Sequence, residues 1–368
     1  MPPSPSVTGL LASRSVILTG HTGFKGPWLT LWLSEIGAHV SGYSLPPPTD
    51  PNLFDALDGA ALLVRHVLAD VRDRDRLAGA MDEAAPEVIV HLAARTTVRQ
   101  SYTEPVETLS TNVLGTLQVL EAVRTVGRRC AVVVVTSDKC YHNDESGRPL
   151  METDRMGGAD PYSASKAAAE LAVDAYRASH FPPAQLDRHG VALATARAGN
   201  VIGGGDWTPD GIVADIVRAP TRREPVRVRN PSAIRPWQHV LEPLDGYLTL
   251  ATHLIGPRAA AFCRGWNFGP RPFGEATVAA LVERFLDGWG EGRWIDESRP
   301  DQLHEAGVLR LSVDAAINEL GWHPRWGFEE AVARTVRWYS RYVNGLVGAR
   351  AACVDDIAAY SLAGPPGR

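Results

Sequence analysis

The sequence has few cysteines and no recognisable metal-binding motif. Its 368 residues include only Cys130, Cys140, Cys263 and Cys353, which are widely scattered, form no CxxC pair and have no histidines at zinc-finger spacing. So few thiols in a chain of this length are typical of a protein that stays reduced. We therefore expect no metal site, no disulfide framework and a cytoplasmic location.

Three further absences argue against a secreted protein and against a membrane or a nucleic acid as partner. No apolar run approaches the ~20 residues that a membrane helix needs. The first 15 residues are rich in proline and serine and lack the basic and then apolar layout of a signal peptide. Lys and Arg total 37 against 42 Asp and Glu, so the formal net charge of −5 leaves no broad basic surface for nucleic acid.

What is present is a regular alternation of two patterns. Short β-branched runs predict strands, and longer amphipathic stretches between them predict helices. The predicted strands are 15–19, 39–43, 62–67, 88–92, 131–136 and 191–197, with a late one at 266–269, and the predicted helices are one through 28–33 and those at 72–84, 105–126 and 162–179. This alternation predicts an α/β fold, a Rossmann-type doubly wound parallel sheet with a smaller C-terminal substrate-binding lobe.

The alternation loosens after about residue 200, where glycines 203–205 and four prolines between 220 and 236 occur. At roughly 150 residues per domain, the length also favours a second unit. We predict a dinucleotide-binding domain over 14–200 plus about 240–272, a lobe over 201–239 and 273–345, and a C-terminal tail over 346–368.

A glycine-rich turn, Gly20-His21-Thr22-Gly23-Phe24-Lys25-Gly26, directly follows the first predicted strand and opens a helix. Glycines at this spacing let the backbone approach a pyrophosphate, and the helix N-terminus offers it free N–H groups. The alternative is a tight strand–helix connection with no ligand. The position within the first strand–helix–strand unit favours a dinucleotide site.

The acid that normally ends the second strand of a NAD-binding fold is absent. That stretch is Gly42-Tyr43-Ser44-Leu45, which has no carboxylate for a ribose hydroxyl and no arginine for a ribose phosphate. The residues at the end of the second strand therefore do not indicate which dinucleotide is the cofactor. Asp70-Val71, after the third strand, suits contact with an adenine edge, although Asp70 could equally cap the next helix.

Tyr162 and Lys166 form the sharpest motif. Four residues apart on a predicted helix, they share a face, and a nearby cation favours a phenolate that can accept a hydroxyl proton. An ordinary surface pair is the alternative, which the upstream dinucleotide turn disfavours.

Thr136-Ser137-Asp138-Lys139 ends the buried strand, at the edge where ligands bind doubly wound sheets. An acid beside a base at this edge is better explained by a catalytic role than by the alternative, a capped loop. Arg197, Asn200 and Arg235 suit phosphate or hydroxyl recognition, although each could be a structural polar residue.

Together these stretches resemble the extended short-chain dehydrogenase/reductase family, from about residue 15 to 345. The matching stretches are GHTGFKG at 20–26, TSDKCY at 136–141, DPYSASK at 160–166, ARAGNVIGGGDW at 196–207 and RNPSAIRPWQHV at 229–240. Within the family the chain is most similar to nucleotide-sugar 4,6-dehydratases. Relatives acting on dTDP- or GDP-sugars have an acid where Lys139 stands, and epimerases lack the Asp-Lys pair.

The resemblance implies conversion of CDP-glucose to CDP-4-keto-6-deoxyglucose, with NAD taking a hydride from C4 and returning it to C6. It implies that Tyr162, assisted by Lys166, removes the 4-hydroxyl proton and that Ser137 binds the 4-oxygen. Asp138 would protonate the departing hydroxyl, and Lys139 would lie near C5. Another nucleotide-sugar dehydratase or epimerase, or a non-catalytic dinucleotide-binding sensor, remains an alternative.

The resemblance also implies two sets of binding residues and an assembly. The cofactor-binding residues would be Gly20, Thr22, Gly23, Phe24, Lys25, Asp70, Val71, Leu92, Ala93, Ala94, Tyr162 and Lys166, and the substrate-binding residues would be Thr97, Asn200 and Arg235. The stretch at 93–99 reads AARTTVR where the family usually has AAQPLVR. Helices 105–126 and 162–179 would form a four-helix bundle in a homodimer. Without an acid near Ser44, and with His21 and Lys25 adding bulk to the glycine turn, we expect NAD to bind loosely.

Overall fold

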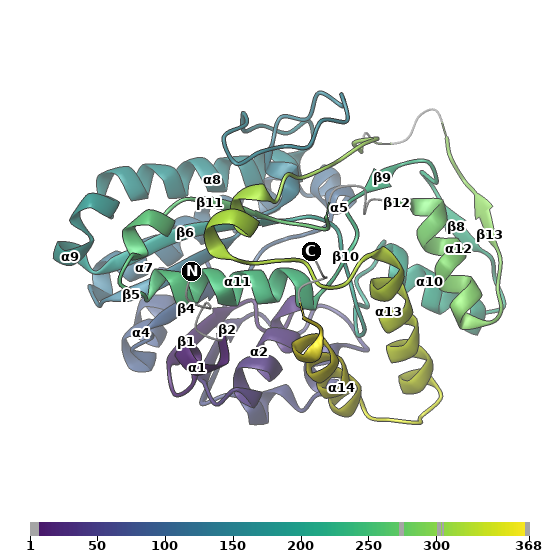
Figure 1. The fold of residues 1–368 in the computed structure, drawn as a ribbon, viewed down its shortest axis with the longest axis horizontal. Helices are drawn as coiled ribbons and strands as arrows, with labels where there is room; N and C mark the ends of the chain where they lie inside the picture. Colours follow the sequence, from purple (N-terminus) through teal and green to yellow (C-terminus); the bar gives the residue numbers. More distant parts are fainter. Residues whose placement is uncertain (1–6, 272–275, 300–302, 304, 365–368) are drawn as a thin grey trace.

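A seven-stranded parallel sheet forms the centre of the protein. The computed structural model describes residues 7–271, 276–299, 303 and 305–364 (Figure 1). The strands lie in the order β11-β6-β5-β4-β1-β2-β3, with every neighbouring pair parallel. They are β1 (Ser15–Thr19), β2 (His39–Ser44), β3 (Arg65–Leu68), β4 (Val88–His91), β5 (Cys130–Val135), β6 (Val191–Ala198) and β11 (Gly265–Phe268).

Both faces of this sheet are covered by helices, as the prediction of a doubly wound sheet requires. Along β5, Val133 and Val135 join one core cluster while Val132 and Val134 join the other, because successive strand side chains point to opposite faces. The first cluster includes α2 (Lys25–Glu35) and α11 (Leu241–Leu254). The second includes α4 (Arg74–Ala84), α7 (Gly115–Val126) and α8 (Pro161–Ser179). The continuous apolar run of β5 therefore reflects burial on both sides.

Most predicted elements lie within a few residues of the observed ones, and two differ. The strand predicted at 62–67 is shorter, because η1 (Gly59–Leu62) precedes β3. The helix predicted over 105–126 consists of α6 (Pro105–Leu109), a π-helical turn η2 (Ser110–Leu114) and α7. The late strand predicted at 266–269 is confirmed as β11, which joins the sheet beside β6.

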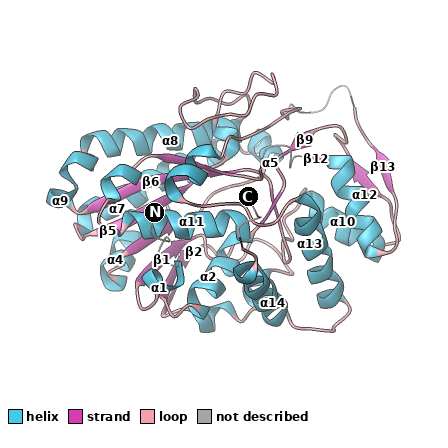
Figure 2. Cartoon of the chain, in the orientation of Figure 1, coloured by secondary structure: helices cyan, strands magenta, loops and turns pink. Residues whose placement is uncertain are grey.

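A smaller lobe lies on the right of Figure 1, opposite α9 at the left edge of the view. It contains α10 (Ile212–Thr221), α12 (Val278–Trp289) and a parallel pair of strands, β8 (Val226–Val228) and β13 (Trp294–Asp296). Two further short pairs of strands are present, and the strands β9 and β12 of one pair lie beside this lobe (Figure 2). They are β7 (Val201–Ile202) with β10 (Gln238–His239), and β9 (Ile234–Arg235) with β12 (Ala276–Thr277).

Much of the predicted C-terminal tail is a helix. Helix α13 (Phe328–Val343) leads to α14 (Ala349–Leu362), which packs against α13 and α2, while residues 365–368 lie outside the described part of the chain. Tyr360 of α14 is fully buried.

The remaining short elements are α1 (Val7–Leu11), α3 (Leu53–Ala56), α5 (Val98–Thr103), η3 (Asp138–Cys140), η4 (Pro183–Gln185), α9 (Leu186–His189), η5 (Ala259–Phe262) and η6 (Ala316–Leu320). Over the described residues, no helix has both the length and the apolar character that crossing a bilayer requires.

Candidate active site

One large cavity, of about 780 Å³, opens at the carboxyl edge of the sheet. Residues that directly follow β1, β4, β5 and β6 line it, together with residues from the smaller lobe. All the predicted cofactor, substrate and catalytic residues lie in its wall: Gly20, Thr22, Gly23, Phe24, Lys25, Asp70, Val71, Leu92, Ala93, Ala94, Thr97, Ser137, Asp138, Lys139, Tyr162, Lys166, Asn200 and Arg235. The fold thus brings together segments that are far apart in the sequence.

The glycine turn has the close backbone packing that a dinucleotide site needs. Gly20 has φ +75°, and a Cβ there would lie 2.6 Å from the backbone nitrogen of Ala93. A Cβ on Gly26 would lie 2.5 Å from the carbonyl oxygen of Gly20. Helix α2 begins at Lys25, near the end of this turn, and its first N–H groups have no partner within the helix. The turn therefore fits a pyrophosphate.

The end of β2 is polar but uncharged. The hydroxyls of Thr22 and Ser44 are 2.8 Å apart, and Thr22 also donates to the Leu45 carbonyl at 2.8 Å. Across the cavity wall, Arg72 donates to both carboxylate oxygens of Asp70, at 2.9 and 2.6 Å, and these bonds lower the pKa of that carboxyl. Neither position offers a free carboxylate to a ribose.

Of the two large side chains in the glycine turn, Lys25 lines the cavity and His21 does not. We expected His21 and Lys25 to add bulk at the phosphate site. The His21 ring is fully buried and packs edge-on against Phe54 and His66, and a Cβ on Gly42 would meet it at 2.6 Å. The Lys25 ammonium donates to the Tyr247 hydroxyl at 3.1 Å, and burial lowers its pKa to about 8. For His21 the expectation was wrong, because the missing side chain of Gly42 leaves room for the ring beneath β2.

The acid and base that follow β5 form a compact turn, η3. The Ser137 hydroxyl donates to Asp138 Oδ1 at 3.0 Å and accepts the Lys139 N–H at 3.2 Å. Lys139 Nζ lies 3.2 Å from Asp138 Oδ1 and 3.3 Å from Asn200 Oδ1. Asp138 Oδ2 is buried and has no hydrogen-bond partner among the described residues. A buried carboxylate oxygen without a partner, in the wall of a cavity, is suited to a reacting group.

Helix α8 carries Tyr162 and Lys166 into the same wall. It begins at Pro161 because Asp160 caps it, accepting the Ser163 N–H at 2.9 Å. Lys166 Nζ donates to the Val135 carbonyl at 3.4 Å, and burial lowers its pKa to about 8. The sequence predicted a lowered pKa for Tyr162, and this was wrong: burial raises it, and the Ser137 hydrogen bond offsets only part of the rise.

Sequence reasoning missed Asn112, which anchors the loop after β4. It lies in the π-helical turn η2, a feature often found at functional sites. Its side chain accepts the Arg95 N–H at 2.8 Å and donates to the Arg95 carbonyl at 3.0 Å and to the Ser165 hydroxyl at 2.8 Å. These bonds tie the loop that bears Ala94 and Thr97 to helix α8. Nothing in the composition around Asn112 distinguishes it. Only an interruption of the long predicted helix could have indicated this residue.

The smaller lobe contributes cations to the cavity. Arg235 is almost fully buried and donates to the Ile234 carbonyl at 3.1 Å, while Arg227 and Arg229 also line the cavity. Arg229 pairs with Asp210 at 2.9 Å. Sequence reasoning missed Arg227 and Arg229, although Arg229 begins the RNPSAIRPWQHV stretch.

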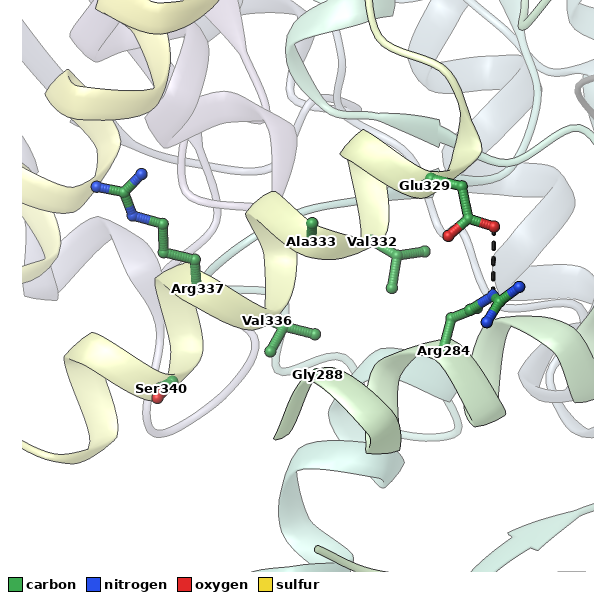
Figure 3. Close-up of a pocket in the computed structure, with 8 residues that line it drawn as sticks. All are labelled: Arg284, Gly288, Glu329, Val332, Ala333, Val336, Arg337 and Ser340. Atoms are coloured by element: carbon green, nitrogen blue, oxygen red, sulfur yellow. Dashed lines mark ion pairs between the residues drawn. The ribbon is translucent and has the colours of Figure 1, made fainter. Parts of the chain in front are cut away.

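A second, smaller hollow of about 340 Å³ lies between α12 and α13 (Figure 3). Arg284 and Glu329 form an ion pair across it at 3.3 Å, and Val332 and Val336 line its apolar side. None of the predicted site residues lies in it. In the described part of the chain, no cluster of three or more His, Cys, Asp or Glu side chains could hold a metal ion.

Comparison with known proteins places the chain among nucleotide-sugar enzymes. The family model described as GDP-mannose 4,6 dehydratase matches residues 17–335. A CDP-glucose 4,6-dehydratase of Salmonella typhimurium is 48% identical over 335 residues, covering 90% of this chain and 92% of the relative.

Two solved structures have the same fold. An epimerase from Methanothermobacter thermautotrophicus has a TM-score of 0.76 at 21% identity, covering 94% of this chain and 98% of that one. A dTDP-glucose 4,6-dehydratase double mutant from Streptomyces venezuelae, with NAD bound, has a TM-score of 0.73 at 25% identity, covering 90% and 98%. The chain belongs to the GDP-mannose 4,6-dehydratase family, within the extended short-chain dehydrogenases/reductases.

Proposed function

We propose that this protein is a hydro-lyase that converts CDP-glucose to CDP-4-keto-6-deoxyglucose and water, with NAD as its cofactor. The observation that carries the proposal is the convergence of the Asp138-Lys139 turn and the Tyr162/Lys166 helix on one cavity with the glycine turn. The 48% identical relative, a CDP-glucose 4,6-dehydratase, supports the choice of nucleotide and sugar.

The residues at the glycine turn fit a dinucleotide. Gly20, Gly23 and the start of α2 would hold its pyrophosphate, and Leu92 and Ala93 would line the adjoining wall. When bound, NAD supplies the hydride acceptor for C4 and the hydride donor for C6, so no net oxidation of the sugar results.

Tyr162 is the group proposed to take the 4-hydroxyl proton. The Ser137 hydroxyl lies near it and lowers its pKa, so the two hydroxyls could hold a sugar oxygen between them. Because burial raises the pKa of Tyr162, a phenolate there depends on stabilising charge in the wall. The ammonium of Lys166, one helical turn away, is the proposed source of that charge.

Asp138 and Lys139 are proposed to carry out the elimination. A 4-keto group acidifies the C5 hydrogen, and Lys139 is proposed to act at that proton. Asp138 would give a proton to the departing 6-hydroxyl from Oδ2, the oxygen without a partner. Arg227, Arg229 and Arg235 are proposed to bind the diphosphate end of the substrate, since guanidinium groups bind phosphate oxygens in pairs.

A turnover assay on a panel of nucleotide sugars tests this function. Purified protein with added NAD should release water from CDP-glucose, giving a product 18 mass units lighter, and should act far more slowly on UDP-, dTDP- and GDP-glucose. An epimerase would leave the mass unchanged, and a sensor would bind NAD without changing any sugar. Preferred dehydration of another nucleotide sugar would overturn the choice of CDP.

We also infer that the protein is a homodimer, held by a four-helix bundle from α6–α7 and α8. These helices contact one another and leave large apolar side chains exposed, with Val106 at 78%, Leu114 at 51% and Leu171 at 58% exposure. Exposed apolar side chains on adjacent helices mark interaction surfaces. Light scattering should give twice the chain mass for the wild type and the chain mass for Leu171→Glu. A monomeric wild type would refute the bundle.

A cytoplasmic location is consistent with the cysteines. The four cysteines are all buried, and each is a free thiol: Cys130, Cys140, Cys263 and Cys353. Free thiols of this kind persist in a reducing compartment.

A further inference from the structure

A buried ion pair lies directly behind the proposed catalytic groups. Glu170 lies on α8, one turn beyond Lys166, and is fully buried. Arg197 lies on β6, and only 3% of its surface is exposed. Arg197 donates to Glu170 Oε1 through Nε at 2.9 Å and to Oε2 through Nη2 at 2.8 Å. A Cβ on Gly265 would lie 2.3 Å from Arg197 Nη2, so the neighbouring strand leaves room for the guanidinium.

All the hydrogen-bonding capacity of the Glu170 carboxylate is used. Thr136 donates to Oε1 and Thr195 donates to Oε2, the latter at 2.8 Å. Burial raises the pKa of Glu170, but the Arg197 guanidinium and the hydrogen bonds outweigh it and hold the pKa below its ordinary value. Glu170 is therefore an ionised and fully bonded anchor inside the protein.

The network reaches both ends of the catalytic turn. Thr136 immediately precedes Ser137. At the other end, Tyr141 follows Cys140, and its hydroxyl accepts from Arg197 Nη1 at 2.8 Å and donates to Asn267 Oδ1 at 2.6 Å. The turn that bears Ser137, Asp138 and Lys139 is thus fixed at its start and its end to the helix that bears Tyr162 and Lys166.

Stability alone does not explain such a pair. Replacing a buried ion pair by apolar residues of similar volume is often neutral or stabilising, because two charges must be taken out of water. Arg197 Nη1 also donates to the Glu152 carbonyl at 3.0 Å, so the pair has four further partners: Thr136, Thr195, Tyr141 and this carbonyl. These bonds fix the orientation of the pair, since each hydrogen bond has a narrow range of angles. Reaction rates are sensitive to this, because a misplacement of ~1 Å in a catalytic constellation can lower turnover by about 100-fold.

We propose that Glu170 and Arg197 are positioning residues that fix the Ser137–Asp138–Lys139 turn relative to Tyr162 and Lys166. Neither residue lines the cavity, so they act through Thr136 and Tyr141. Only the kinetic test of this proposal depends on the proposed dehydratase activity.

Two matched variants test it. Thr136→Val and Thr195→Val each remove one hydroxyl that donates to the same carboxylate, at nearly constant side-chain volume. Thr136 adjoins the catalytic turn, whereas Thr195 lies on β6 away from the turn. Both should lower the thermal midpoint by a similar amount. Only Thr136→Val should lower kcat, by about tenfold or more, with KM changed less than about twofold.

Tyr141→Phe supplies an independent variant at the other end of the turn, and it should reproduce the loss of kcat. Equal kcat values for Thr136→Val and Thr195→Val, or an effect confined to KM, would overturn the proposal.

Hydrogen exchange gives a readout that needs no turnover. Peptides spanning 136–142 should exchange faster in Thr136→Val and Tyr141→Phe than in Thr195→Val or the wild type. Unchanged exchange in both variants would refute the positioning role. A wild type that dehydrates no nucleotide sugar would refute the proposed function and leave the exchange result to decide this proposal.

Discussion

Glu242 on α11 should make the protein less stable as the pH rises from 5 to 8. Its carboxylate is fully buried and accepts the N–H groups of Arg325 and Trp326, at 3.0 and 2.6 Å, and the Tyr360 hydroxyl at 2.9 Å. Burial raises its pKa from 4.5 to about 7, against the lowering effect of these hydrogen bonds. The cluster joins α11 to α14, so its protonation state affects how the C-terminal helix is held.

The sign follows from proton binding. Between pH 4.5 and 7 the folded protein holds a proton on Glu242 that the unfolded chain has released, so the free energy of unfolding falls with rising pH. One pKa unit corresponds to ~1.4 kcal/mol, which gives a loss of about 2–3 kcal/mol from this group between pH 5 and 8.

Glu242→Gln should remove this loss. The amide oxygen can accept both backbone N–H groups, and the amide nitrogen can donate to the Tyr360 hydroxyl once that hydroxyl rotates. Relative to the wild type, the variant should therefore gain about 2–3 kcal/mol of unfolding free energy between pH 5 and 8.

Urea unfolding at fixed protein concentration, followed by tryptophan fluorescence, measures this difference at each pH. Glu121→Gln is a suitable control, because its Arg124 and Tyr176 hydrogen bonds lower the pKa of Glu121 to about 2. Because the pKa of Glu121 is below 5 in both the folded and the unfolded protein, Glu121→Gln should change the free energy of unfolding by the same amount from pH 5 to 8. A constant difference for Glu242→Gln as well would refute the reasoning.

Three further predictions concern the proposed reaction. Tyr162→Phe should fold and bind NAD nearly normally yet lose turnover by roughly 100-fold or more, as expected for a lost acid–base group; near-normal kcat would remove Tyr162 from the mechanism. Lys139→Met should block deuterium uptake at C5, measured by mass spectrometry of the product, while still permitting oxidation at C4; wild-type uptake would move the base to Asp138 or water. Because Ser44 offers no carboxylate, the ribose lacks a charge-assisted hydrogen bond typically worth about 1.5–3 kcal/mol, so added NAD should stimulate dehydration of the purified protein. No NADH absorbance should accumulate, and stoichiometric NADH release would instead indicate a simple dehydrogenase.

The sheet and the edge at which the cavity opens could be predicted because their signals are local. The six-residue apolar run at β5 and the glycine turn after β1 each depend on a few adjacent residues. The carboxyl ends of parallel strands meet at one edge, so residues following β1, β4 and β5 had to share a cavity. The four-residue spacing of Tyr162 and Lys166 likewise fixed their common face on α8.

Other features were not predictable because they depend on distant partners. The sequence left Arg197 open between ligand binding and structure, and only its bonds to Glu170, 27 positions away, show that it binds a buried carboxylate and not a ligand. The interruption of the 105–126 helix at Asn112 depends on the loop at Arg95 and on Ser165 of α8. Helix α14 has weak periodicity, yet it packs against α2 through Tyr360 and Trp32.

By itself, the sequence determined the α/β alternation, the glycine turn and the residue types proposed to carry out the chemistry, since these follow from residue type and short-range spacing. The tertiary structure decided the ionisation of those residues. Tyr162 illustrates the difference: a lysine four residues away predicts a lowered pKa, whereas burial of the side chain raises it. Desolvation depends on everything packed around a side chain, and no local pattern in the sequence contains that information.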